Sequence, residues 1–315
     1  MARNQPDLEV EPHCSIDQGP GAGHSPSLSR AASGLPGKMN HQVAGSDSGS
    51  IGLFDSGVGG LSVLTAIREQ LPNEDLLYVA DSRYAPWGDK SVEFVRRRSG
   101  IISAFLIGQG AKIVVIGSNT GTAASAELLR ATAKVPIVAI EPAIKPAVAA
   151  TRSGVIGVLV TSVTSQSTRF NKLLEQFGKN VRIVTQAAPG LVERIERGDL
   201  EGEETRSLLQ RYLAAFRLEG ADTIVLGSTH YVFLGPIITE IMGPNVLLVD
   251  SGHAVARQVA KVLREQSLSK VDTSDGDVRF WTSGDPARER AIISRLWRHK
   301  IHVDLFPEGQ DNASS

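Results

Sequence analysis

Cysteine is almost absent from this sequence of 315 residues, in which Cys14 is the only one. A single thiol excludes a disulfide framework within the chain and any zinc or iron–sulfur site built from several thiolates. Apolar runs are short, and none approaches the roughly 18 residues that a membrane-spanning helix needs. The first ten residues, MARNQPDLEV, lack the charged start and apolar stretch of a signal peptide. We therefore expect a cytoplasmic protein with no membrane partner.

A surplus of either charge is also missing. The chain has 33 Lys and Arg residues against 34 Asp and Glu residues, which gives a net charge of −1. A protein dedicated to nucleic acid normally carries a basic surplus, so we expect no nucleic-acid partner. The length, in contrast, is ample for about two domains with buried cores.

Aromatic residues are absent from the first 50 positions, which hold 7 Gly, 5 Pro and 8 Ser. Such a segment buries too little apolar area to offset the entropy of ordering it, so we predict a disordered tail over residues 1–49. Its histidines at positions 13, 24 and 41 are too dispersed for a metal site, and the sequence calls for no metal elsewhere. Met39 is an alternative start of the chain, and a flexible end is predicted at 307–315.

From Ile51 onward, short apolar runs rich in β-branched residues alternate with amphipathic stretches. We predict strands at 51–54, 76–80, 112–117, 136–140, 155–160, 181–186, 223–227 and 246–250, with helices such as 61–71 and 203–220 between them. Continuous apolar strands, each followed by a helix, are typical of parallel strands buried on both faces. The sequence therefore predicts an α/β fold.

Two segments of this body repeat each other. Ile113-Val-Val-Ile-Gly-Ser-Asn-Thr120 and Thr223-Ile-Val-Leu-Gly-Ser-Thr-His230 are each a strand followed by Gly, Ser and two polar residues. Phe54-Asp-Ser-Gly57 is echoed in the same way by Val249-Asp-Ser-Gly252. Ligands of open parallel sheets bind beyond the carboxyl ends of the strands, where loops and helix N-termini offer N–H groups. We predict a polar cleft between two similar α/β halves; the alternative is ordinary turn and helix-cap chemistry.

Nucleotide-binding motifs do not fit. Gly57-Val-Gly59-Gly60 is followed by Ser62 where the dinucleotide pattern needs a third glycine, and the phosphate-loop pattern GxxxxGK[ST] is absent. The residues at these strand ends match a different family.

Six segments resemble, in order and spacing, the motifs of glutamate racemases. They are IGLFDSGVGGLSVL (51–64), DSRYAPWG (81–88), IEPAIKPA (140–147), APGLV (188–192), LGSTHY (226–231) and TSGD (282–285). The resemblance covers about residues 51–306. It implies two pseudo-symmetric parallel-sheet α/β domains, 50–149 plus 249–306 and 150–248, with the active site in the cleft between them. It also implies a cofactor-independent interconversion of L- and D-glutamate, which supplies D-glutamate for peptidoglycan.

The implied reaction needs one base on each face of the substrate Cα. One base removes the weakly acidic proton, and the other, protonated, delivers a proton from the opposite side. Cysteine suits both roles because a thiol with a pKa of about 8.5 can be held as thiol or thiolate. In this chain, however, Ser118 and Ser228 stand where the family has its two cysteines, and Ala188 where relatives often have a third.

A hydroxyl keeps nearly the shape of a thiol but has no useful ionised fraction near neutral pH. Because each tenfold loss of rate corresponds to ~1.4 kcal/mol of barrier, we expect weak or absent racemisation. Three interpretations stay open: an engineered double substitution that traps a substrate complex, a natural paralogue that binds without turnover, and a slow racemase whose serines are activated by Asp55 and His230. A serine hydrolase built on Ser228 and His230 is disfavoured because no third group is evident.

By resemblance, Ser118 and Ser228 occupy the proton-transfer positions, and Asp55, His230 and Glu196 assist them as acid/base groups. The assisting residues also have simpler interpretations: a turn cap for Asp55, a satisfied core histidine for His230 and a solvated helix face for Glu196. The predicted substrate-binding residues are Asp55, Ser56, Trp87, Gly88, Asn119, Thr120, Thr164, Thr229 and His230. Among them, neutral Asn and Thr donors, together with strand-end amides, suit the carboxylates of glutamate.

Two further positions depart from the family pattern. Trp87 stands where the family usually has Tyr, and Val163 where it usually has Gly or Ala. Both side chains are larger and would narrow the pocket, which leaves open the preference for glutamate over another acidic amino acid. The sequence also leaves the oligomeric state open, although a homodimer is a frequent arrangement for soluble enzymes.

Overall fold

The computed structural model describes residues 49–307. The predicted tail at 1–49 and the predicted flexible end at 307–315 therefore lie outside the described residues, except for Gly49 and Pro307.

Six strands form the first sheet, in the order β10-β9-β2-β1-β3-β4. They are β1 (Ser50–Asp55), β2 (Leu76–Ala80), β3 (Ala111–Ile116), β4 (Ile137–Ala139), β9 (Val278–Thr282) and β10 (Val303–Leu305). Every neighbouring pair is parallel, and β1 and β2 are buried along their whole length. The carboxyl ends of these strands consequently meet at one edge of the sheet.

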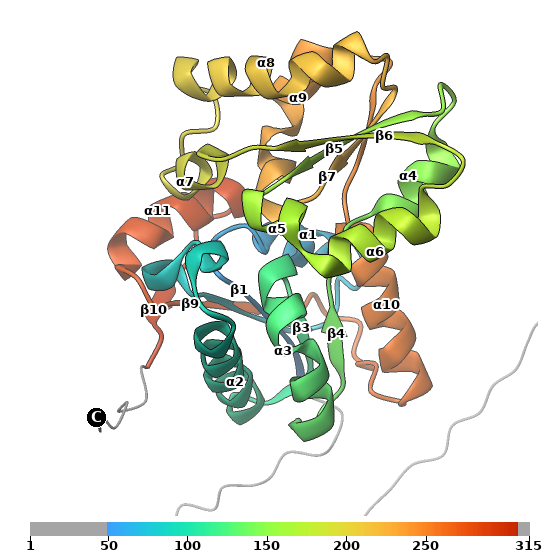
Figure 1. Ribbon diagram of the computed structural model, residues 1–315. Coiled ribbons are helices and arrows are strands. Elements are labelled where there is room, and N and C mark those ends of the chain that lie inside the picture. Colours follow the sequence, from blue (N-terminus) through green and yellow to red (C-terminus); the bar gives the residue numbers. More distant parts are fainter. Residues whose placement is uncertain (1–48, 308–315) are drawn as a thin grey trace, which may run out of the picture. The chain divides into compact units, whose positions relative to one another are not determined.

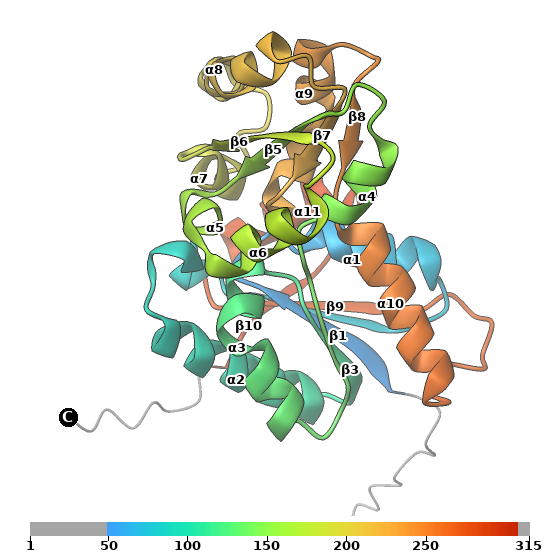
Figure 2. The same ribbon diagram turned by 45° about the vertical axis from the view of Figure 1, so that its right-hand side comes forward.

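Helices cover both faces of the first sheet (Figure 1). On one face α2 (Val92–Gly108) and α3 (Asn119–Thr132) pack against the apolar side chains of β2 and β3. On the other face lie α1 (Leu61–Gln70), α10 (Gly252–Glu265) and α11 (Pro286–Trp297). Figure 2 shows α1 and α10 side by side.

Four parallel strands form the second sheet, in the order β6-β5-β7-β8. They are β5 (Val155–Val160), β6 (Arg182–Ala187), β7 (Thr223–Leu226) and β8 (Leu247–Val249). One face is covered by α8 (Glu203–Leu218) and α9 (Gly235–Met242), and the other by α4 (Ile144–Ala150) and α6 (Thr168–Phe177).

Five short helices occupy the loops that follow strands. They are α5 (Ser162–Gln166), α7 (Leu191–Glu196) and the 3-10 helices η1 (Ser82–Tyr84), η2 (Trp87–Asp89) and η3 (Thr229–Leu234). Such strand-end loops are where an open parallel sheet binds its ligands.

The two parallel sheets with helices on both faces confirm the predicted α/β class. Each of the predicted strands is present, but β9 and β10 were missed because their apolar runs are short and interrupted by Arg279 and Asp304. The domain boundaries at 149/150 and 248/249 stay a prediction; the chain passes between the sheets after β4 and again after β8.

Candidate active site

A pocket lies at the carboxyl ends of strands from both sheets. Its cavity volume is about 150 Å³, roughly ten times what one water molecule needs. Its lining includes Asp55, Ser56, Trp87, Gly88, Ser118, Asn119, Thr120, Thr164, Ser228, Thr229 and His230. These are the predicted site residues with one exception, Glu196, which lies outside the lining and contacts the lining residue His230.

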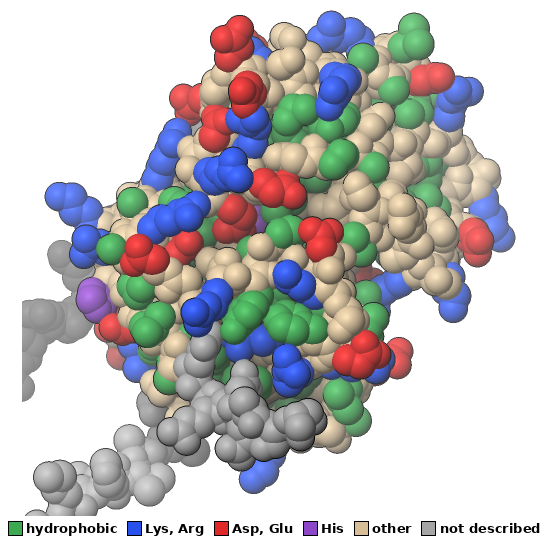
Figure 3. All heavy atoms as spheres, turned by 60° about the vertical axis from the view of Figure 1, so that its left-hand side comes forward, with side chains coloured by type: hydrophobic (Ala, Val, Ile, Leu, Met, Phe, Trp, Pro, Cys, Tyr) green, Lys and Arg blue, Asp and Glu red, His purple; other side chains and the backbone are tan. Residues whose placement is uncertain are grey.

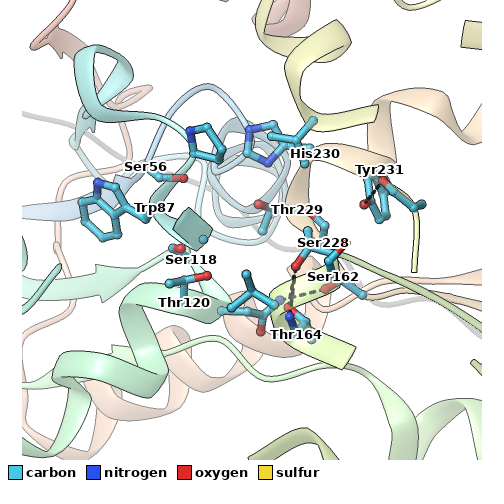
Figure 4. A pocket seen from close by; sticks show the side chains of 18 of the residues that line it. Ser56, Trp87, Ser118, Thr120, Ser162, Thr164, Ser228, Thr229, His230 and Tyr231 are labelled. Carbon is cyan, nitrogen blue, oxygen red and sulfur yellow. Dashed lines mark hydrogen bonds between the residues drawn. The ribbon is translucent and has the colours of Figure 1, made fainter. Parts of the chain in front are cut away.

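Ser118 and Ser228 reach the pocket from equivalent places in the two sheets. Ser118 follows β3 and Ser228 follows β7, and both residues are more than nine-tenths buried. In the view of Figure 4, Ser118 lies with Ser56 and Trp87 on one side of the pocket and Ser228 on the other. The paired strand ends therefore present two hydroxyls to one cavity, as the internal repeat predicts.

The two hydroxyls differ in their local bonds. Ser118 is the N-cap of α3, and its Oγ accepts a hydrogen bond of 3.2 Å from the N–H of Gly121. Ser228 precedes the 3-10 helix η3 and makes no side-chain cap bond there. A serine at 118 thus stabilises the helix that bears it, whereas a serine at 228 has no such role.

A buried acid–base pair lies beside Ser228. Nε2 of His230 is 2.5 Å from Oε1 of Glu196, and the two side chains are 5% and 14% exposed. The same carboxylate oxygen accepts a hydrogen bond of 2.9 Å from the N–H of Val58. Glu196 at the end of α7 is therefore held by contacts from both sheets, not by solvent as its helical pattern also allowed.

Asp55 ends β1 at the pocket wall. Its Oδ2 accepts a hydrogen bond of 3.1 Å from Thr229 Oγ1, and its Oδ1 accepts one of 2.6 Å from the N–H of Ser56. The bond from Thr229 joins the first-sheet loop to the second-sheet loop that carries Ser228 and His230.

Both assisting groups have shifted pKa values. Burial raises the pKa of the Asp55 carboxyl, against the opposing effects of His230 and the hydrogen bond from Ser56. Burial alone lowers the pKa of His230, but the hydrogen bond and charge of Glu196, with the charge of Asp55, outweigh it and leave that pKa raised. Both shifts favour the protonated form of the group, and perturbed pKa values of this kind are typical of side chains that transfer protons.

The glycines of Gly57-Val-Gly59-Gly60 make room for these charged groups. A Cβ on Gly57 would lie 1.9 Å from Glu196 Oε1, and one on Gly59 would lie 2.3 Å from His230 Nδ1. Real Cβ atoms do not approach so closely, so a side chain at position 57 would displace the Glu196 carboxylate and one at position 59 the His230 ring. This loop binds protein side chains and leaves no reason to interpret it as a phosphate loop.

The pocket lining carries acidic groups but no lysine or arginine among the described residues. The acidic residues of the lining are Asp55, Asp89 and Glu193. Positive potential comes instead from the N-terminus of α3, whose first residues, Asn119 and Thr120, line the pocket. A carboxylate ligand would be bound by amides and hydroxyls, as the sequence predicts.

Trp87 is fixed by a buried ion pair. Its indole N–H donates to Asp81 Oδ2 at 3.1 Å, and Arg98 binds the same carboxylate through Nη2 at 2.6 Å and Nε at 3.0 Å. The indole ring packs against α3, where a Cβ on Gly121 would lie 2.9 Å from it. Val163 also lines the pocket, beside Gly88.

Several lining residues were not predicted. They include Asp89, Thr161, Ser162, Glu193 and Tyr231. Thr161 and Ser162 directly follow β5, so the strand-end argument applied to that strand would have found them. Asp89 and Glu193 carry no sequence signal that separates them from solvated charges.

Comparison with known proteins places this geometry in a family. A family model described as Asp/Glu/hydantoin racemase matches residues 59–259. The chain belongs to this family. The match includes all of η3 and most of the pocket lining, and so the paired serines occur within a racemase framework.

Among curated members of the racemase family, the glutamate racemase of Pseudomonas aeruginosa is 50% identical over 252 residues, covering 80% of this chain and 95% of that protein. The glutamate racemase of Stutzerimonas stutzeri is 47% identical over 258 residues, covering 82% and 97%.

Solved racemase structures have the same fold. A glutamate racemase isoform of Bacillus anthracis matches with a TM-score of 0.75 at 29% identity, covering 83% of this chain and 98% of that one. The glutamate racemase of Escherichia coli, solved with L-glutamate and the activator UDP-MurNAc-Ala, matches with a TM-score of 0.71 at 28% identity, covering 82% and 97%.

Residues 49–307 also lack two other features. No three His, Cys, Asp or Glu side chains of this part of the chain are placed to hold a metal ion. None of its helices has the length and apolar character to cross a membrane. On the face shown in Figure 3, basic and acidic side chains are interspersed.

Proposed function

We propose that this racemase-family chain binds glutamate and interconverts its L- and D-forms without a cofactor, at a rate limited by its two serines. The observation that carries the proposal is the pair of strand-end hydroxyls, Ser118 and Ser228, on one pocket with Asp55 and the His230–Glu196 pair. The identity to glutamate racemases over nearly their whole length supports glutamate as the substrate.

In this proposal some pocket residues bind the substrate and others assist proton transfer. The α3 N-terminus and the hydroxyls of Thr120 and Thr164 bind carboxylates without a fixed cation. Because Asp55 belongs to the first-sheet side and His230 to the second, each can assist proton transfer at the nearer serine. Both pKa values are raised, which favours a proton on each group and suits them to hand one to the serine beside them.

A second candidate function is glutamate binding without turnover. It is favoured by the hydrogen bond from Gly121 N–H to Ser118 Oγ, because this bond occupies the hydroxyl in helix capping. A family thiol at that position would be a weaker acceptor and a stronger acid.

Isotope exchange separates the two functions. We expect the unaltered chain in D₂O to exchange the Cα proton of L-glutamate slowly. The two-cysteine variant (Ser118→Cys/Ser228→Cys) should exchange it about 10²-fold faster or more, the range of a well-placed acid–base group. Ser125→Cys is the matched control, because it adds a thiol to α3 outside the pocket lining.

The outcomes distinguish a slow racemase from a protein that binds glutamate without turnover. If the two-cysteine variant exchanges no glutamate, the proposed reaction is wrong. If it exchanges while the unaltered chain only binds glutamate in calorimetry, the chain is a binding protein of racemase descent. The supply of D-glutamate for peptidoglycan, a cytoplasmic location and a homodimer remain part of the proposal.

A further inference from the structure

Tyr78 is the only residue of β2 whose side chain carries a polar atom. It is fully buried, with Leu53 of β1 and Phe280 of β9 beside it in register. A buried phenol hydroxyl needs a hydrogen-bond partner. That partner is the carbonyl oxygen of Gly57, to which Tyr78 Oη donates at 2.6 Å.

The carbonyl of Gly57 and the N–H of Val58 belong to one peptide group. This group is planar and trans, so its two polar ends point in opposite directions. Its N–H donates to Glu196 Oε1 at 2.9 Å, and that oxygen lies 2.5 Å from Nε2 of His230. Three hydrogen bonds therefore run from Tyr78, through one peptide group, to the histidine in the pocket.

Glycine at position 57 makes this peptide group easy to rotate unless it is held. Glycine leaves room here for the Glu196 carboxylate, which a Cβ would displace, but it also tolerates a wide range of backbone angles. A free carbonyl would let the group turn its N–H away from Glu196. The hydroxyl of Tyr78 removes that freedom and polarises the peptide group toward the carboxylate.

We propose that Tyr78 is a positioning residue that locks the Gly57–Val58 peptide group, so that its N–H holds the Glu196 carboxylate against His230. Tyr78 does not line the pocket and acts only through this peptide group. Burial, reinforced by the charges of Asp55 and Glu196, raises the pKa of Tyr78 well above its usual value. The phenol therefore remains a neutral donor at any working pH. The proposal rests on the proposed function only in that the reaction uses His230.

The first test needs no substrate. In Tyr78→Phe we expect amide hydrogen exchange at Val58 to accelerate at least about tenfold, because its bond to Glu196 opens locally. Tyr212→Phe is the matched control: Tyr212 is buried and donates to the Pro189 carbonyl at 2.9 Å, a bond that involves neither Gly57 nor Glu196. The proposal is overturned if the exchange rate of the Val58 amide is unchanged in Tyr78→Phe, or if it rises equally in Tyr78→Phe and Tyr212→Phe.

The second test is kinetic and uses the two-cysteine variant as the parent. Tyr78→Phe should lower kcat about fivefold to tenfold while KM changes less than about twofold. When Glu196→Gln is already present, adding Tyr78→Phe should lower kcat by less than about twofold, because Tyr78 acts through the Glu196 carboxylate. If Tyr78→Phe lowers kcat by the same factor with Glu196 and with Gln at position 196, its role is merely structural and the proposal is overturned.

The proposed function and the proposed role of Tyr78 can each fail without the other. If the two-cysteine variant does not racemise, the proposed function fails, and the Val58 amide still decides the role of Tyr78. If Tyr78→Phe does not fold, 3-fluorotyrosine at position 78 replaces it. The fluorinated phenol is a stronger hydrogen-bond donor to the Gly57 carbonyl, so the Val58 amide resonance should move downfield. An unmoved resonance overturns the proposal.

Discussion

Replacing Glu196 by Gln is the sharpest perturbation of the acid–base pair, because it removes the charge and keeps the shape. Glu196 Oε1 lies 2.5 Å from His230 Nε2, with both side chains largely buried. A hydrogen bond to a charged group is worth about 1.5–3 kcal/mol, which corresponds to about 1–2 pKa units. Burial alone lowers the pKa of His230, so removing the charge of the Glu196 carboxylate should lower that pKa.

The assay is an NMR titration of histidine labelled with ¹³C at Cε1, with the resonance assigned by His230→Gln. Glu193→Gln is the control, because the charge of Glu193 has a smaller effect on the pKa of His230. A shift smaller than about 0.3 units in Glu196→Gln would refute the claim that this carboxylate raises the pKa.

The sign of the stability effect follows from the same shift. Because the folded-state pKa of His230 is raised, its contribution is fully present below the unfolded value of about 6.5. It is lost as the pH rises through the folded-state pKa. Glu196→Gln should therefore destabilise the fold more at pH 6 than at pH 9, as measured by urea unfolding. An equal loss at both pH values contradicts this account.

Three further substitutions test other contacts. Ser118→Ala should lower the free energy of unfolding by about 1 kcal/mol because α3 loses its N-cap, which urea unfolding measures; no loss would mean that the cap is absent. Arg98→Ala leaves the carboxylate of Asp81 buried without its cation and should cost about 3–5 kcal/mol, with a change in Trp87 fluorescence. Burial raises the pKa of Glu289 to about 7, so its ionisation weakens the fold as the pH rises from about 4.5 through 7. Glu289→Gln should therefore raise Tm at pH 8 and leave it unchanged at pH 4; the hydroxyl of Ser82 keeps an acceptor in either form.

Strand ends carried most of the sequence-based prediction. The runs before Ser118 and Ser228 are apolar and continuous, so their ends, and the polar residues that follow, could be located from the sequence alone. The same reasoning placed Asp55 at the end of β1. Because parallel strands share one edge, the predicted residues meet in one pocket even though they are spread over more than 170 positions of the chain, from Asp55 to His230.

Contacts across the fold could not be predicted in this way. The pattern around Glu196 is equally that of a solvated helix face, and only the approach of Val58 and His230 shows that it is buried. In the sequence, Tyr78 looks like any other core residue of β2, because its role depends on the carbonyl of Gly57, 21 residues away. Such contacts are set by packing between elements, which local patterns do not encode.

The two-base account is tested most directly by restoring one thiol at a time. Ser118→Cys and Ser228→Cys, each made alone, should exchange the Cα proton of one glutamate enantiomer with D₂O faster than that of the other. Because the two positions reach the pocket from opposite sides, their preferences should be opposite, as ¹H NMR of L- and D-glutamate would report. The same preference in both variants, or no exchange in either, would contradict the assignment of Ser118 and Ser228 to opposite faces of the substrate.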